Sequence, residues 1–328
     1  MTNDRAGGRA IVIGGSMAGL LAARVLADRF GEVVLVDRDT FPNTAEFRKG
    51  VPQSRHLHVL LARGGRILEH LFPGLLDDLT DAGAVSIRWP QDVLWLGPGG
   101  WGTRTARGLT SISCRRELLE QKVRARVLDA TAVTALDGHD VIGLLEASEG
   151  SAVAGVRLRA RADSAERDLE ADLVVDASGR GSRAPAWLEE IGYQSPAQTV
   201  INSFLGYASR LYERSDSADR DWEALFLQPK APEGTRAAAL FPVDGDRWHV
   251  TLAGIARDYP PTEDEGFLEF ARSLRTPILY DTIRDARPLT SISAYRRTEN
   301  QHRHFDRLPR WPERFVVIGD AVCCFNPI

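Results

Sequence analysis

The residues best suited to chemistry form one glycine-rich segment near the N-terminus, Gly14-Gly15-Ser16-Met17-Ala18-Gly19, and Asp37 follows Gly19 by 18 positions. Glycines allow a tight turn and close packing of a helix on a strand, and the helix N-terminus then directs N–H groups at a phosphate. An acid about 20 residues further on binds a ribose. This spacing predicts a dinucleotide site in which Ser16 replaces the middle glycine. The alternative is a structural glycine turn in an unrelated α/β fold.

The flanking residues predict the elements that hold this turn. An apolar run at 10–13 precedes it, an apolar-periodic stretch reaches Gly31, and a second apolar run at 33–36 ends at Asp37. Strand, turn, helix and strand in this order indicate a parallel βαβ unit. The motif alone does not separate FAD from NAD, because both present the same adenosine diphosphate.

The rest of the chain predicts an α/β protein with two sheets. Alternating stretches broken at Asp137-Gly138 and Glu149-Gly150 indicate a β-meander. Residues 198–256 alternate again, which indicates a second domain with an antiparallel sheet. Further elements are expected as helices at 115–128 and 263–274 and buried strands at 173–176 and 315–318.

Composition excludes several classes of protein. The 328 residues are 43% hydrophobic, enough for a core. The net charge is −4 and the sequence has no basic stripe, which argues against a nucleic-acid-binding protein. No apolar run approaches the roughly 20 residues of a membrane span. Three cysteines give no disulfide framework. We therefore expect a cytoplasmic protein without a transmembrane segment.

Six stretches carry a resemblance to a known family: GGSMAGL, VVLVDRD, RKGVPQSRHLHVLL, CRRELLE, DLVVDASGRGS and FVVIGDAVCCFNP. Together they resemble the FAD-dependent monooxygenases related to p-hydroxybenzoate hydroxylase and squalene epoxidase. The closest similarity is to the bacterial flavin-dependent epoxidases of polyether biosynthesis. The resemblance implies a Rossmann-type FAD-binding domain, with a parallel sheet and β-meander, plus a second domain. It favours FAD over NAD.

The resemblance also implies roles for individual residues. The turn holding Gly14, Ser16 and Gly19 would bind the pyrophosphate, and Asp37 the adenosine ribose. Arg48 would reach the phosphates or the flavin edge. The remaining residues expected at the cofactor are Met17, Arg38, Lys49, Arg116 and, after the last strand, Gly319 with Asp320 at the ribityl chain. The alternatives are solvated surface charges for the arginines and an ordinary turn for Gly319-Asp320.

The implied activity is insertion of one oxygen atom from O₂, through a C4a-hydroperoxyflavin, into an apolar natural-product-like substrate by epoxidation or hydroxylation. Electrons would come from NAD(P)H or a separate flavin reductase. Direct NADPH use is in question because Ser178-Gly179 stands where aromatic hydroxylases have Asp-Gly, with Asp176 two residues earlier. Alternatives are a double-bond reductase, an inactive flavin-binding remnant, or a halogenase, whose required lysine would come from Lys49, Lys122 or Lys230.

Family members continue beyond Asn326-Pro327, whereas this chain stops at Ile328. The hypothesis is a truncated product with weak FAD retention. The predicted division assigns 1–80, 101–185 and 291–328 to the FAD domain. It assigns 81–100 and 186–290 to the substrate domain.

Several other side chains have two interpretations. His56 either lines the flavin or substrate region or is a hydrogen-bonded interior histidine. The pairs His56/His58 and His302/His304 could bind a metal, but no Cys or carboxylate is spaced to complete a site, so no metal is expected. Cys323 and Cys324 are more consistent with packing than with a redox pair. Five tryptophans either wall a substrate cavity or fill cores: Trp89, Trp95, Trp101, Trp222 and Trp248.

Overall fold

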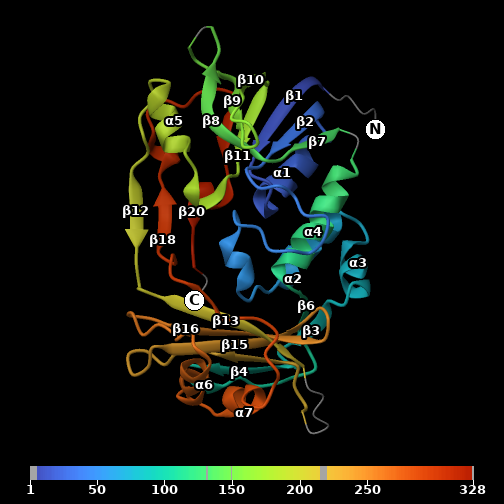
Figure 1. Ribbon diagram of the computed structural model, residues 1–328, viewed down its shortest axis with the longest axis vertical. Helices are drawn as coiled ribbons and strands as arrows, with labels where there is room; N and C mark the ends of the chain where they lie inside the picture. The colour runs from blue at the N-terminus through green and yellow to red at the C-terminus, as the bar shows by residue number, and fades with distance from the viewer. Residues whose placement is uncertain (1–5, 131, 149, 215–219, 327–328) are drawn as a thin grey trace. The chain divides into compact units, whose positions relative to one another are not determined.

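The computed structural model describes residues 6–130, 132–148, 150–214 and 220–326 (Figure 1). Two compact units share the chain. Unit 1 comprises Met1–Val51, Glu120–Ile201 and Asn300–Ile328, and unit 2 comprises Pro52–Leu119 and Asn202–Glu299.

The chain switches between units after Val51, Leu119, Ile201 and Glu299, whereas the sequence placed the switches at residues 80, 100, 185 and 290. The early first switch has a physical reason. The bridge between Leu60 and Ile112, and the packing of helix α2 on strand β6, tie the residues after Val51 to unit 2.

Unit 1 is built on a parallel sheet with strand order β19-β11-β1-β2-β7. Helix α1 links β1 to β2, which confirms the predicted βαβ unit (Figure 1). The inner strands are continuously apolar because both faces of a parallel sheet are buried. The elements are β1 (Ala6–Ile13), α1 (Met17–Leu26), β2 (Phe30–Val36), β7 (Val133–Leu136), β11 (Leu173–Asp176) and β19 (Phe315–Val317).

Two smaller antiparallel sheets complete unit 1. The predicted β-meander is the first, with order β10-β9-β8; Glu149 of its predicted turn lies outside the described residues. The second has order β12-β18-β20. The elements are β8 (His139–Glu146), β9 (Val153–Ala160), β10 (Glu166–Glu170), η2 (Gly179–Gly181), α5 (Ala184–Glu190), β12 (Gln198–Ile201), β18 (Asn300–Arg303), η3 (Phe305–Arg307), η4 (Gly319–Ala321) and β20 (Cys323–Cys324). Helix α4 (Arg116–Leu128) begins in unit 2 and continues in unit 1.

Unit 2 is built on a seven-stranded sheet with order β17-β13-β16-β15-β14-β4-β5. All neighbours are antiparallel except β14 and β4. This agrees with the predicted second domain. The elements are η1 (Pro52–Arg55), α2 (Ala62–Leu71), α3 (Leu75–Asp81), β3 (Val85–Trp89), β4 (Val93–Gly97), β5 (Gly100–Trp101), β6 (Leu109–Ser113), β13 (Gly206–Glu213), β14 (Ala224–Leu227), β15 (Arg236–Val243), β16 (Arg247–Gly254), α6 (Asp264–Arg272), α7 (Ile278–Ile283) and β17 (Ser293–Tyr295).

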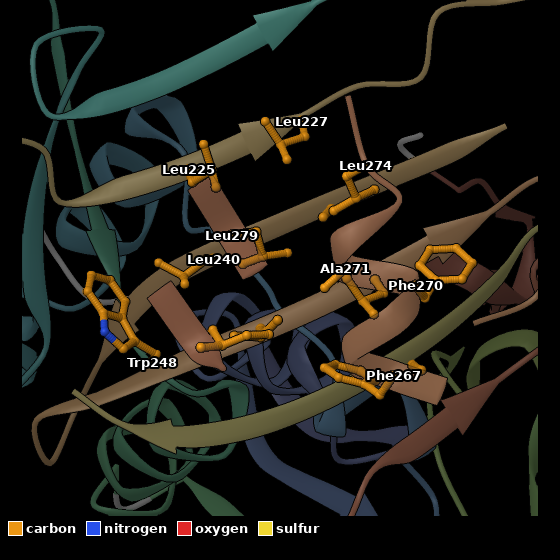
Figure 2. Close-up of a cluster of buried hydrophobic side chains, with 14 of the residues drawn as sticks. Leu225, Leu227, Leu240, Trp248, Phe267, Phe270, Ala271, Leu274 and Leu279 are labelled. Carbon is orange, nitrogen blue, oxygen red and sulfur yellow. The ribbon is translucent and has the colours of Figure 1, made fainter. Parts of the chain in front are cut away.

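Strand alternation in this sheet gives one face that packs on helices α6 and α7 and an opposite face that mixes apolar and polar side chains. Trp248 and Leu252 of β16 face helices α6 and α7, where Phe267 fills the core (Figure 2). His249 and Thr251 lie between them in the strand and point to the opposite face. The face away from the helices therefore carries these polar side chains among apolar ones such as Phe241 and Ala253.

The tryptophans do not form a single wall. Trp222 and Trp248 pack together, with ring centroids 6.2 Å apart, in or against the core under α6 and α7. Trp89 and Trp95 make an edge contact at 6.4 Å beside Phe226 on the other face. The core-packing interpretation therefore holds for Trp222 and Trp248.

In the described part of the chain, no helix combines the length and apolar content that a membrane crossing needs.

Candidate functional site

The glycine turn has the geometry that only glycine satisfies. Gly14 has φ +99°, and a Cβ there would lie 2.6 Å from the carbonyl oxygen of Ala177. A Cβ on Gly19 would lie 1.7 Å from the carbonyl oxygen of Gly14. The carbonyl oxygen of Gly14 belongs to the turn directly after β1, and Gly19 lies in α1. The size of the residue at position 19 therefore sets how closely the helix approaches the end of the strand. Both glycines are therefore needed for the reasons given by the dinucleotide-binding motif: a tight turn at Gly14 and close packing of the helix on the strand at Gly19.

The N-terminus of α1 is suited to an anion. Its first turn is uncharged, and the first N–H groups of an α-helix have no intrahelical acceptor. Gly319, with φ +62°, lies against this turn, because a Cβ there would be 3.0 Å from Ala18 Cβ. Asp320, the next residue, is exposed. The structure thus brings the turn after β19 to the start of α1, and Met17 is half-buried there.

Asp37 directs its carboxylate at the glycine turn. Its Oδ2 accepts a hydrogen bond from the Gly15 N–H at 2.6 Å, and its Oδ1 accepts one from the Asp39 N–H at 2.8 Å. The residue is 9% exposed. The position after β2 therefore holds the acid beside the turn and not in bulk solvent.

Arg48 is buried beside the same turn, so the surface-charge alternative is wrong for this residue. Its Nε and Nη2 donate to Glu120 Oε1 at 2.9 and 2.5 Å, and its Nη1 lies 3.3 Å from Asp37 Oδ1. Burial alone would lower the pKa of Arg48, but the charges of Glu120, Asp37 and Asp39 outweigh it and raise the pKa. The guanidinium stays positively charged at the mouth of the turn.

Sequence reasoning missed three residues of this cluster. Glu120 accepts a hydrogen bond from Ser16 Oγ at 2.8 Å as well as those from Arg48. The Phe41 ring is contacted by the guanidinium groups of Arg48 at 5.3 Å and of Arg124 at 5.2 Å. The sequence did offer one indication of Glu120 and Arg124. They are four residues apart in α4, beside its apolar residues, so the helix places both charges on a face that is buried.

The structure does not test the other expected contacts of the cofactor. Arg38 and Lys49 are exposed. Arg116 is the first residue of α4, in the part of that helix grouped with unit 2. The assignment of these residues to the cofactor stays a prediction.

Asp176, the acid that precedes the altered Asp-Gly position, stabilises its own turn. It is fully buried, and its carboxylate accepts hydrogen bonds from the Ser178 N–H at 2.9 Å and from Ser182 Oγ at 2.5 Å. Burial raises the pKa of Asp176, against the lowering effect of these bonds. The Asp176 carboxylate is therefore held by hydrogen bonds within its own loop. Ser178 has no carboxylate, so it does not replace the aspartate that aromatic hydroxylases have at this position.

Unit 2 holds a second cluster of polar side chains. It lies on the face of the seven-stranded sheet opposite helices α6 and α7. His56 Nδ1 lies 2.8 Å from Ser209 Oγ on β13, and Ser209 Oγ lies 2.6 Å from Thr251 Oγ1 on β16. Thr251 Oγ1 also accepts the Leu57 N–H at 3.1 Å. The segment after η1 is therefore fixed to the sheet through side chains.

His56 is neutral near neutral pH. It is 6% exposed and flanked by the rings of Tyr207 and Tyr295, with centroids at 5.9 and 5.5 Å. Burial, followed by the positive charges of His58 and Arg55, lowers its pKa from 6.5 to about 4. A neutral imidazole held through Nδ1 keeps Nε2 for another partner.

Comparison with solved structures defines the class of fold. The FAD-dependent myxobacterial chondrochloren halogenase CndH matches with a TM-score of 0.72 and 18% identity, covering 98% of this chain and 70% of that one. The flavin-dependent brominase Bmp2 matches at 0.71 and 15%, covering 98% and 74%. PqsL, a probable FAD-dependent monooxygenase from Pseudomonas aeruginosa, matches at 0.67 and 17%, covering 97% and 79%. The fold is that of FAD-dependent halogenases and monooxygenases.

The sequence comparison gives the family. Over 326 residues the chain is 33% identical to the protein Rv3254 of Mycobacterium tuberculosis strain H37Rv, covering 97% of this chain and 68% of that protein. The chain belongs to the family of Rv3254. No protein-family profile matches it.

Proposed function

We propose that this protein binds FAD and uses it to insert one oxygen atom from O₂ into a small apolar organic molecule, by epoxidation or hydroxylation. The observation that carries the proposal is the joint placement of the Gly14–Gly19 turn, Asp37 and Arg48 at the start of α1. The halogenase and monooxygenase folds that resemble this chain support it.

The residues present fit FAD. The N-terminus of α1 complements the charge of a diphosphate. The N–H groups of Arg48 already donate to Glu120, Asp37, Asp39 and the Gly15 carbonyl, so its role would be to hold the glycine turn in place. The Asp37 carboxylate, beside the turn, suits the hydroxyls of an adenosine ribose, and Asp320 suits those of a ribityl chain. When bound and reduced, FAD would supply the capacity to activate O₂.

The protein's own task would be to orient the substrate and to exclude water. We propose that unit 2 does this with His56, Ser209 and Thr251, on the face of its seven-stranded sheet away from α6 and α7. The His56 ring lies near two tyrosine rings and is held through Nδ1, so its Nε2 would suit a polar group on an otherwise apolar substrate.

Cofactor choice tests the first step. FAD and FMN share the flavin but differ in the adenosine that Asp37 would bind, so fluorescence titration should show much tighter binding of FAD. Asp37→Asn should weaken FAD binding about tenfold, the loss of one charge-assisted hydrogen bond, and leave FMN unchanged. Asp28→Asn, which alters an exposed acid after the same helix, is the matched control. Equal affinity for FAD and FMN would refute the proposed cradle.

Oxygen chemistry tests the second step. The FAD-loaded protein, reduced with NADPH, NADH or an added flavin reductase, is given a panel of alkenes and phenols under air. Oxygen consumption matched by an epoxide or hydroxylated product supports the proposal. Release of all the oxygen as hydrogen peroxide with every substrate contradicts it, and product formed without oxygen indicates a double-bond reductase.

Halogenation is the second candidate, because two of the matched structures are described as a brominase and a halogenase. All three lysines are in the described part of the chain, and none is buried: Lys49 is exposed, Lys122 is half-buried and Lys230 pairs with Glu233 at 2.6 Å. This distribution favours monooxygenation. A product that requires added bromide or chloride would reverse the preference.

A further inference from the structure

Three potential metal ligands meet in unit 1, outside the dinucleotide cradle. They are His302 on β18, His304 at the start of η3 and Asp306 within η3. One ligand atom from each lies within 4.8 Å of the other two. Strand β18 ends at Arg303, and the turn from His304 into η3 brings His304 and Asp306 to His302.

The hydrogen bonds of His304 leave one ring nitrogen for a ligand. Its Nε2 lies 2.8 Å from Thr199 Oγ1, on the neighbouring strand β12. Its Nδ1 is buried and has no hydrogen-bond partner among the described residues, and the residue is only 8% exposed. A buried polar atom without a partner destabilises the fold, and an ion at Nδ1 would relieve that cost.

The neighbouring hydroxyl selects the tautomer that a metal needs. If Nε2 carries the proton and donates it to Thr199, the Nδ1 lone pair is directed at the cluster. Histidine ligands in proteins commonly donate their second ring N–H to an acceptor in this way. Thr199 and His302 are also direct partners in the β12–β18 register.

The two imidazoles are unusually close for unrelated side chains. Their ring centroids lie 4.3 Å apart with planes inclined at 51°, and one nitrogen of each ring lies within 4.8 Å of the other and of an Asp306 oxygen. Asp306 is exposed, so its carboxylate can adjust its rotamer. Four-coordinate ions with bonds of about 2.1 Å separate ligand atoms by about 3.4 Å, so the cluster needs to contract by roughly 1 Å.

We propose that His302, His304 and Asp306 form a binding site for a divalent transition-metal ion of the Zn²⁺ type. Two imidazole nitrogens and one carboxylate leave at least one coordination position for water or a small ligand, and they disfavour Mg²⁺ and Ca²⁺, which prefer all-oxygen sites. The site is independent of the proposed flavin chemistry. The expectation of no metal was based on the absence of a suitably spaced carboxylate, and that premise is wrong, since Asp306 completes the set.

The test uses the full chain without a histidine tag, stripped with a chelator and titrated with Zn²⁺ against a chromophoric competitor. We expect one site per chain. His302→Ala and Asp306→Asn should each weaken it at least tenfold, while Asp306→Glu retains most of the affinity. His70→Ala, which removes an exposed histidine from α2, is the matched control and should change nothing.

A second readout separates coordination from folding. Co²⁺ bound at this site should give visible d–d bands of a low-coordinate ion, and these should disappear in Asp306→Asn while the far-ultraviolet circular dichroism stays that of the parent. The proposal is overturned if Zn²⁺ affinity and stoichiometry are unchanged in both His302→Ala and Asp306→Asn, or if Mg²⁺ competes at equal concentration.

Discussion

Replacing Gly19 by alanine places a methyl group where the backbone leaves no room. The added Cβ would lie 1.7 Å from the carbonyl oxygen of Gly14, whereas ordinary contact begins at 3.4 Å. Helix α1 must therefore move about 1.7 Å away from β1 at its first turn, because neither partner is a flexible side chain. Overpacking of this kind costs about 3 kcal/mol, the upper end of the usual range.

The same displacement should weaken FAD binding. A movement of 1.7 Å takes hydrogen bonds of about 2.9 Å beyond bonding distance. Loss of two charge-assisted bonds at about 1.5 kcal/mol each gives about 3 kcal/mol, or roughly a 100-fold weaker complex. We expect this loss in a fluorescence titration, together with a lower thermal unfolding temperature for Gly19→Ala.

Gly7→Ala is the matched control. Gly7 lies in β1, and a Cβ there meets nothing within 4 Å, so FAD affinity and stability should remain close to those of the parent. The reasoning about the cradle is refuted if Gly19→Ala binds FAD as tightly as Gly7→Ala does.

Three further predictions follow from buried charges and a strained turn. Arg48→Ala leaves Glu120 buried without its main partner and should destabilise unit 1 by about 3–5 kcal/mol in urea unfolding, with partial recovery in the double variant Arg48→Ala/Glu120→Ala. Burial lowers the pKa of His56 to about 4 and of His249 to about 3, so the unfolded chain binds more protons between these values and 6.5. Stability should therefore fall as pH decreases through that window, and His249→Gln should shift the acid transition, followed by tryptophan fluorescence, to lower pH. Gly319→Ala, at φ +62°, should cost about 1–2 kcal/mol and weaken FAD binding, measured by the same titration.

The parts of the fold that local rules determine could be predicted from the sequence. The βαβ unit was accessible because apolar runs, a glycine turn and a terminal acid each have a local physical cause. The β-meander and the alternating strands of unit 2 were accessible for the same reason. The helix expected at 263–274 is α6, Asp264–Arg272.

The parts that depend on contacts distant in sequence could not be predicted. Glu120 reaches Arg48 across 72 positions, and His56 reaches Ser209 across 153, so neither partnership has a sequence spacing. Asp306 was missed for a different reason. It follows the strand that holds His302, and only the turn that begins at His304 and continues into η3 brings its carboxylate to the rings.

The buried ion pairs at the glycine turn hold this turn in a fixed conformation. Asp37, Asp39 and Glu120 surround Arg48, and Arg124 lies beside them with its pKa lowered by burial. Removing such groups from water is expensive, and a hydrophobic cluster of the same volume would stabilise the fold at least as well. A purely structural role therefore gives no reason to retain them. The proposed cofactor would give one, because the cluster fixes the Asp37 carboxylate and the backbone at the start of α1, the two groups that would meet its ribose and its phosphates.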